Sequence, residues 1–196
     1  MEPNMFCYQC QETAKGTGCI LKGVCGKESH TAQAMDLLLF VVRGVSVVAD
    51  VLRKADCPVS EEVNIFVTDA LFCTITNANF DDESILKRVD KGITMRNGLI
   101  QEAKHNKVLL PKVDELTWQG TRDDYAGKAK TVGVLREQNE DLRSLKELLV
   151  YGLKGMAAYL EHVMRLGFND DTVHVFMQRA LATIAVSYTH LTLPTI

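Results

Sequence analysis

The most apolar stretch of this 196-residue chain reads LLLFVVRGVSVVADVL and occupies residues 37–52. Apolar side chains fall on every face that a helix over these residues would present, which is typical of a helix buried on several sides. The stretch is shorter than the roughly 20 residues that a membrane span needs. It also contains Arg43 and Asp50, and Asp36 directly precedes it. We therefore predict a buried central helix and no membrane association.

Helical periodicity continues on both sides of this stretch. Long helices are expected over residues 29–53, 60–77, 81–105, 139–166 and 170–185, with a shorter helix near residues 123–130. No segment alternates strictly between apolar and polar residues, so the sequence predicts no strand. The predicted fold class is all-α: a helical bundle over residues 29–185, preceded by a cysteine-rich loop over residues 1–28.

The clearest amphipathic pattern lies in residues 139–166. Its expected buried face consists of Leu145, Leu148, Leu149, Gly152, Met156, Leu160, Val163 and Met164. The charged residues on the opposite side are Lys146, Glu147, Lys154 and Glu161. Gly152 and Gly155 are expected to let another helix approach closely, and so is Gly44 in the central helix.

The last residues break the helical pattern. After Ala185 the chain reads VSYTHLTLPTI, a string rich in Thr and Leu without a helical period. This string resembles the translated adaptor sequence found at the ends of some assembled sequences. We expect residues 186–196 to be a non-native tail, and an ordinary C-terminal extension is the alternative.

Composition narrows the class of protein. The chain is 46% hydrophobic and 24% charged, with a formal net charge of -3, and it lacks the Lys/Arg cluster typical of proteins that bind nucleic acid. Four of its six cysteines lie within the first 25 residues, and no basic and then apolar secretory signal precedes them. A cytoplasmic, reducing location is expected, where clustered cysteines indicate metal ligands rather than disulfides.

The four clustered cysteines are Cys7, Cys10, Cys19 and Cys25, with the spacing C-x2-C-x8-C-x5-C. Four soft thiolates select zinc or an iron–sulfur cluster. Structural zinc sites more often consist of two tight C-x2-C pairs, and the loose second pair here favours iron–sulfur. A helical module with a structural four-cysteine zinc site remains the alternative. Cys57 and Cys73 lie apart from the motif and are expected to be a loop thiol and a buried thiol.

Several segments resemble one known family. MFCYQCQETAKGTGCILKGVCGK at residues 5–27 is similar to the N-terminus of the hybrid cluster protein family, also called prismane proteins or hydroxylamine reductases. The resemblance extends through LLLFVVRGVSV, FCTITNANFDD, VGVLREQNEDLRSLKELLVYGLKGMAAYLEHVMRLGF and FMQRAL. It covers essentially residues 5–185.

The resemblance implies a cofactor and an activity. Cys7, Cys10, Cys19 and Cys25 match the family's proximal cluster ligands, and their short spacing resembles the class that binds a 4Fe–4S cubane. Family members reduce hydroxylamine to ammonia, or nitric oxide to nitrous oxide, with electrons from a redox partner protein. Their catalytic hybrid iron–sulfur–oxygen cluster is held by later α/β domains, which this shorter chain lacks. The expected role is therefore electron entry, with no catalytic residue on this chain and no hydroxylamine reductase activity of its own.

Overall fold

The computed structural model describes residues 5–13, 16–76 and 78–190, with side chains described as far as residue 186. The helices in chain order are α1 (Ser29–Lys54), α2 (Glu61–Ile75), α3 (Asp82–His105), α4 (Asp114–Thr117), the 3-10 turn η2 (Arg122–Asp124), α5 (Tyr125–Val132), the 3-10 turn η3 (Val134–Arg136), α6 (Glu140–Arg165) and α7 (Asp171–His190). Within the described residues, the only β-type pairing is one isolated bridge in the cysteine loop. The all-α prediction is confirmed.

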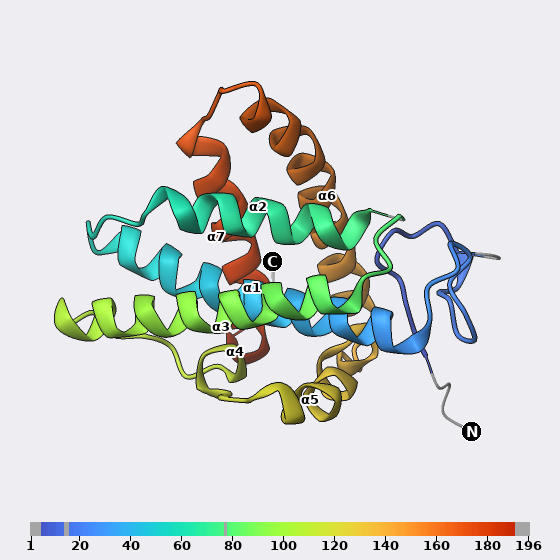
Figure 1. Cartoon of the computed structure of the whole chain (residues 1–196). Helices are drawn as coiled ribbons and strands as arrows, with labels where there is room; N and C mark the ends of the chain where they lie inside the picture. Colours follow the sequence, from blue (N-terminus) through green and yellow to red (C-terminus); the bar gives the residue numbers. More distant parts are fainter. Residues whose placement is uncertain (1–4, 14–15, 77, 191–196) are drawn as a thin grey trace, which may run out of the picture.

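Helix α1 is the centre of the bundle. It packs against α2, α3, α5 and α7, and Figure 1 shows it running through the middle of the molecule from the cysteine loop at one end. Its side chains are buried on every face, and Leu37, Phe40 and Val45 are all fully buried. The predicted central helix is therefore confirmed, because a helix without a polar face is stable only when neighbours surround it.

A connection between α3 and α5 lies against α1 at Gly44. A Cβ atom on Gly44 would come within 2.5 Å of the backbone oxygen of Glu115, so only glycine fits here. Arg96, which is fully buried on α3, donates to the same Glu115 oxygen at 2.9 Å and to the Trp118 oxygen at 2.8 Å. The close approach predicted for Gly44 is thus confirmed, although its neighbour is a short turn of helix, α4, rather than a long one.

Helix α6 corrects the sequence prediction for its buried face. The residues that it buries are Lys146, Val150, Leu153, Lys154, Ala157 and Leu160. Leu145 and Leu148, which were expected to be buried, are 64% and 66% exposed. Gly152 and Gly155 have no neighbour within 4 Å of a built Cβ, so the expected helix–helix approach at these glycines is wrong. The prediction is right for Leu160, which is buried, and Leu149, Met156 and Met164 are partly buried against the core. Helix α6 packs mainly against α2.

Helix α7 packs against α1 and runs past the predicted end at Ala185, as far as His190. Backbone hydrogen bonds can continue a helix for a turn after its apolar period stops. Residues 191–196 of the predicted non-native tail lie outside the described residues, and the origin of the tail stays a prediction. No helix in the described part of the chain is both long and apolar enough to cross a membrane.

Candidate metal centre

The four predicted ligand cysteines lie on one loop that precedes α1. All four thiols are free; Cys7 is buried and Cys10, Cys19 and Cys25 are partly exposed. In Figure 1 the loop forms one end of the molecule, beside the start of α1. The other two cysteines lie elsewhere: Cys73 is buried in α2, where Asn79 donates to its sulfur at 3.0 Å, and Cys57 follows α1.

A two-residue bridge joins the first and third cysteines of the loop. The Cys7 nitrogen donates to the Cys19 oxygen at 3.0 Å, and the Cys19 nitrogen donates to the Cys7 oxygen at 2.9 Å. Two strand residues that exchange both bonds have their Cα atoms about 5.5 Å apart. The bridge therefore brings two of the four predicted ligands together through backbone hydrogen bonds.

A tight turn presents the fourth cysteine. The Gly23 nitrogen donates to the Lys27 oxygen at 2.8 Å, and the Gly26 nitrogen donates to the Gly23 oxygen at 2.8 Å. Gly26 has φ +97, a conformation that side-chain-bearing residues rarely adopt. A Cβ atom on Gly23 would lie 3.1 Å from the Cys25 sulfur, so the missing side chain leaves room directly beside this thiol.

The loop is tied to the bundle by a buried polar network centred on Gln9. The Lys154 amine of α6 donates to the Gln9 backbone oxygen at 2.9 Å and also to its side-chain oxygen, Oε1. The Gln9 amide nitrogen in turn donates to Asp36 of α1 at 2.6 Å. The amphipathic pattern of residues 139–166 predicts Lys154 on the exposed side, which is wrong, and it does not predict this network. The position of Lys154 among Val150, Leu153 and Ala157 was the available signal.

Burial dominates the electrostatics of this region. It raises the pKa of the Cys7 thiol to about 11. Burial, and next the carboxylate of Glu147, raise the pKa of Asp36 to about 7. Burial lowers the pKa of Lys154 to about 8, although Glu147 and Asp36 oppose this shift. Charged forms are disfavoured here because few water molecules can solvate them.

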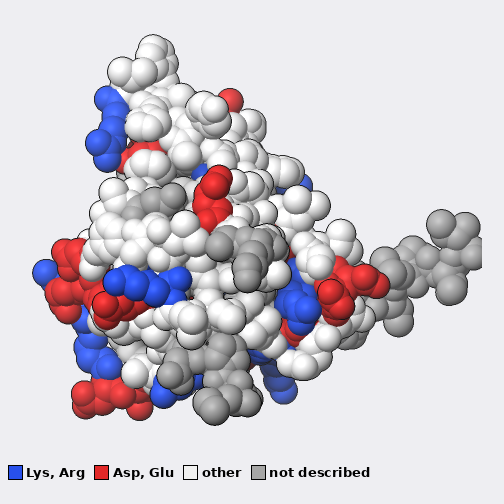
Figure 2. Space-filling view, turned by 90° about the vertical axis from the view of Figure 1, so that its right-hand side faces the viewer, with Lys and Arg blue, Asp and Glu red and all other residues white. Residues whose placement is uncertain are grey.

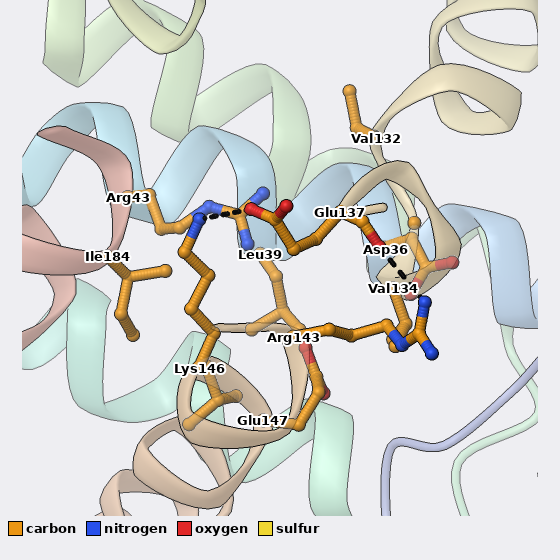
Figure 3. Close-up of a pocket in the computed structure, with 12 residues that line it drawn as sticks. Asp36, Leu39, Arg43, Val132, Val134, Glu137, Arg143, Lys146, Glu147 and Ile184 are labelled. Atoms are coloured by element: carbon orange, nitrogen blue, oxygen red, sulfur yellow. Dashed lines mark hydrogen bonds and ion pairs between the residues drawn. The ribbon is translucent and has the colours of Figure 1, made fainter. Parts of the chain in front are cut away.

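A small cavity lies behind Asp36, between α1 and α6. Its volume of about 30 Å³ is comparable to that of one water molecule. Figure 3 shows Asp36 and Arg43 projecting from α1 and Arg143, Lys146 and Glu147 projecting from α6. Lys146 donates to the Glu137 carboxylate at 2.8 Å, and Arg143 donates to the Glu137 backbone oxygen at 3.0 Å. The cavity is thus surrounded by charged side chains that bond to one another, and it is too small for a substrate.

The surface at the loop end is mixed in character. Figure 2 looks onto this end; the middle of the face is mostly uncharged, and acidic and basic side chains gather toward its sides. An open groove of about 670 Å³ runs between the loop and α6 and is lined by apolar residues including Phe6, Ile20 and Leu148, together with Arg143 and Glu147. The cysteine loop is therefore accessible from solvent along one side.

The thiols are not assembled into a finished metal site. Across residues 5–13, 16–76 and 78–190, no three His, Cys, Asp or Glu side chains are grouped closely enough to hold a metal ion. The residues present nevertheless fit a thiolate-bound metal centre in their chemistry. The donor set is four free thiols, a glycine leaves space beside the Cys25 sulfur, and Lys154 supplies a buried cation.

Comparison with known proteins identifies the class to which this all-helical, cysteine-loop chain belongs. The sequence model of the Prismane/CO dehydrogenase family matches residues 5–196. The chain is a member of the Prismane/CO dehydrogenase family, as the resemblance predicted.

Individual relatives are named hydroxylamine reductases. The protein of Bacteroides thetaiotaomicron is 54% identical over 182 residues, which is 92% of this chain and 32% of the relative. The protein of Porphyromonas gingivalis is 47% identical over 187 residues, 95% of this chain and 34% of the relative. The protein of Desulfitobacterium hafniense is 46% identical over 182 residues, 91% of this chain and 33% of the relative. The chain thus spans about a third of the length of the curated relatives it matches.

Proposed function

We propose that this chain is the N-terminal iron–sulfur electron-transfer domain of a hydroxylamine reductase-like hybrid cluster protein. Cys7, Cys10, Cys19 and Cys25 are the proposed ligands of one 4Fe–4S cluster. The observation that carries the proposal is the group of four free thiols on one loop, in a chain whose relatives are named hydroxylamine reductases. Such a cluster, when bound, supplies one-electron oxidation and reduction.

The residues around the loop fit that role. The paired backbones of Cys7 and Cys19 hold two of the ligands near each other. Burial of Met5 and Cys7 keeps water from one side of the loop, and exclusion of water shifts the potential of a cluster. The turns at Gly23 and Gly26 bring Cys25 back toward the loop. The solvent-accessible side faces the groove along α6, where a redox partner protein could deliver electrons.

In this proposal, the reduction of substrate is carried out by a longer protein of which this chain is the N-terminal part. Reduction of hydroxylamine to ammonia, or of nitric oxide to nitrous oxide, takes place at a hybrid iron–sulfur–oxygen cluster whose ligands do not occur in this chain. The setting is cytoplasmic. The isolated chain is an electron relay and gives no turnover of hydroxylamine with reduced viologen; measurable turnover would contradict this assignment.

The cluster is tested by metal analysis of the chain produced anaerobically. We expect iron and sulfide in equal amounts and an EPR signal after chemical reduction. Cys10→Ser and Cys25→Ser should lose most of the iron, whereas the matched control Cys57→Ser should retain it, because Cys57 lies outside the loop. A colourless chain that holds one zinc ion would overturn the proposal in favour of a structural zinc site.

A further inference from the structure

Lys154 is a buried cation without a carboxylate in hydrogen-bonding contact. Its side chain is 1% exposed, and both of its hydrogen bonds go to Gln9, one to the backbone oxygen and one to the amide oxygen. Burial of a charged amine costs several kcal/mol unless nearby groups compensate. The buried Lys154 amine is therefore stable in its charged form only if negative charge lies nearby.

Gln9 lies between the first two cysteines of the loop. Its backbone and one side of its amide are held by Lys154, and the other side of the amide donates to Asp36 at 2.6 Å. Gln9 and Asp36 are themselves only 5% and 8% exposed. A single residue of the Cys7–Cys10 turn is thus fixed to α6 and α1 at once.

The cysteine thiols belong to the electrostatic environment of Lys154. The acidic groups that raise its pKa against burial are Glu147, Asp36, Cys7 and Cys10, in that order. Two of these four are proposed metal ligands. Thiolates that bind a cluster carry negative charge permanently, and the interaction with a buried amine is then stronger than in the metal-free chain.

We propose that Lys154 is a positioning residue of the metal centre: through Gln9 it fixes the Cys7–Cys10 turn, and its buried charge favours the reduced state of the bound cluster. This inference rests on the proposed iron–sulfur function. Reduction adds one negative charge to the cluster, and a fixed cation at the same side stabilises that added charge. The reduction potential is therefore higher with Lys154 than without it.

The test compares Lys154→Met with Lys146→Met in the full chain. Both lysines are buried on α6, but Lys146 donates to Glu137, which is not part of the cysteine loop. Hydrogen exchange of the metal-free chain reports on positioning, and a redox titration followed by EPR reports on charge. Circular dichroism confirms that each variant keeps its helices.

We expect Lys154→Met to speed amide exchange in residues 7–10 at least tenfold. It should also lower the equilibrium constant for reduction about tenfold, which corresponds to about 59 mV for one electron. Lys146→Met should leave both measurements close to the parent. Equal effects of the two substitutions, or no effect of Lys154→Met, would overturn the proposal.

Gln9→Ala separates the two roles and serves if Lys154→Met does not fold. This substitution removes the amide contacts and leaves the lysine charge in place. Exchange of residues 7–10 should rise, though less than in Lys154→Met because Lys154 still donates to the backbone oxygen of residue 9, while the reduction equilibrium changes less than twofold. Unchanged exchange in Gln9→Ala would refute the positioning role. If the parent chain binds no iron, the proposed function fails and the charge role fails with it, whereas the exchange measurements still decide the positioning role.

Discussion

Helices α1 and α6 have the same length, 26 residues, and opposite surroundings. Nineteen residues of α1 are buried, compared with six of α6. Helix α1 has neighbours on every side, whereas α6 packs mainly on α2 and leaves Leu145, Leu148 and Tyr159 in solvent. The apolar residues of α1 therefore predict its burial correctly. The apolar residues of α6 do not predict which face of that helix is buried.

The difference in burial between α1 and α6 predicts its largest effect on the free energy of unfolding when one apolar side chain is truncated in each helix. Phe40 of α1 is fully buried, meets Trp118 edge-on at 5.9 Å between ring centroids and lies 4.6 Å from the Lys128 amine. Phe40→Ala should lower the free energy of unfolding by about 3–5 kcal/mol. Leu148→Ala on α6 should change it by less than about 0.5 kcal/mol. Urea denaturation followed by circular dichroism measures both, and similar losses would refute the contrast.

A matched pair of glycines gives the next effect. Gly44→Ala in α1 should destabilise the protein by about 1–3 kcal/mol, because the new methyl group would meet the Glu115 backbone at 2.5 Å. Gly152→Ala in α6 should stabilise it by about 0.5–1 kcal/mol, because the site is open and alanine favours helix. Thermal melting of the two variants distinguishes the signs. The same sign for both would contradict the packing described here.

The smallest effect concerns Asp36 of α1, which lies near the charged residues Glu147 and Lys154 of α6. Burial raises the pKa of Asp36 to about 7 from an ordinary 3.8, in the company of Glu147, Lys154 and Arg43. Between these values the folded chain holds a proton that the unfolded chain has released, so stability falls as pH rises from about 4 to 7. Asp36→Asn removes this titration. The stability difference between parent and variant should therefore shift by at least about 1 kcal/mol between pH 5 and pH 7.5.

Urea titrations of the metal-free chain at several pH values measure this shift. Glu62→Gln provides a control, because Glu62 pairs with Lys91 at 3.0 Å on the surface and is not among the groups that shift the pKa of Asp36. A parent–variant difference that stays constant with pH would show that Asp36 is ionised normally.

The burial of the central helix could be predicted from sequence, because its apolar residues lie on all faces and no single buried face has to be identified. The position of the cysteines and the family could also be predicted, since both are local sequence features. The buried face of α6 could not, because the partner of Lys154 is Gln9, 145 positions away. A lysine in an amphipathic pattern is ordinarily solvent-exposed, and only the folded loop supplies its hydrogen-bond acceptors. The spacing of the four cysteines alone does not place their thiols relative to one another in three dimensions.

The bridge between Cys7 and Cys19 has a consequence for the entropy of assembly. Bringing two points of a flexible chain together costs free energy that grows slowly with the number of residues between them. In this protein two backbone hydrogen bonds between Cys7 and Cys19 close that ring. These bonds offset part of the cost of holding the two cysteines together, and preorganisation of this kind increases the affinity for a ligand that joins them without any additional contact.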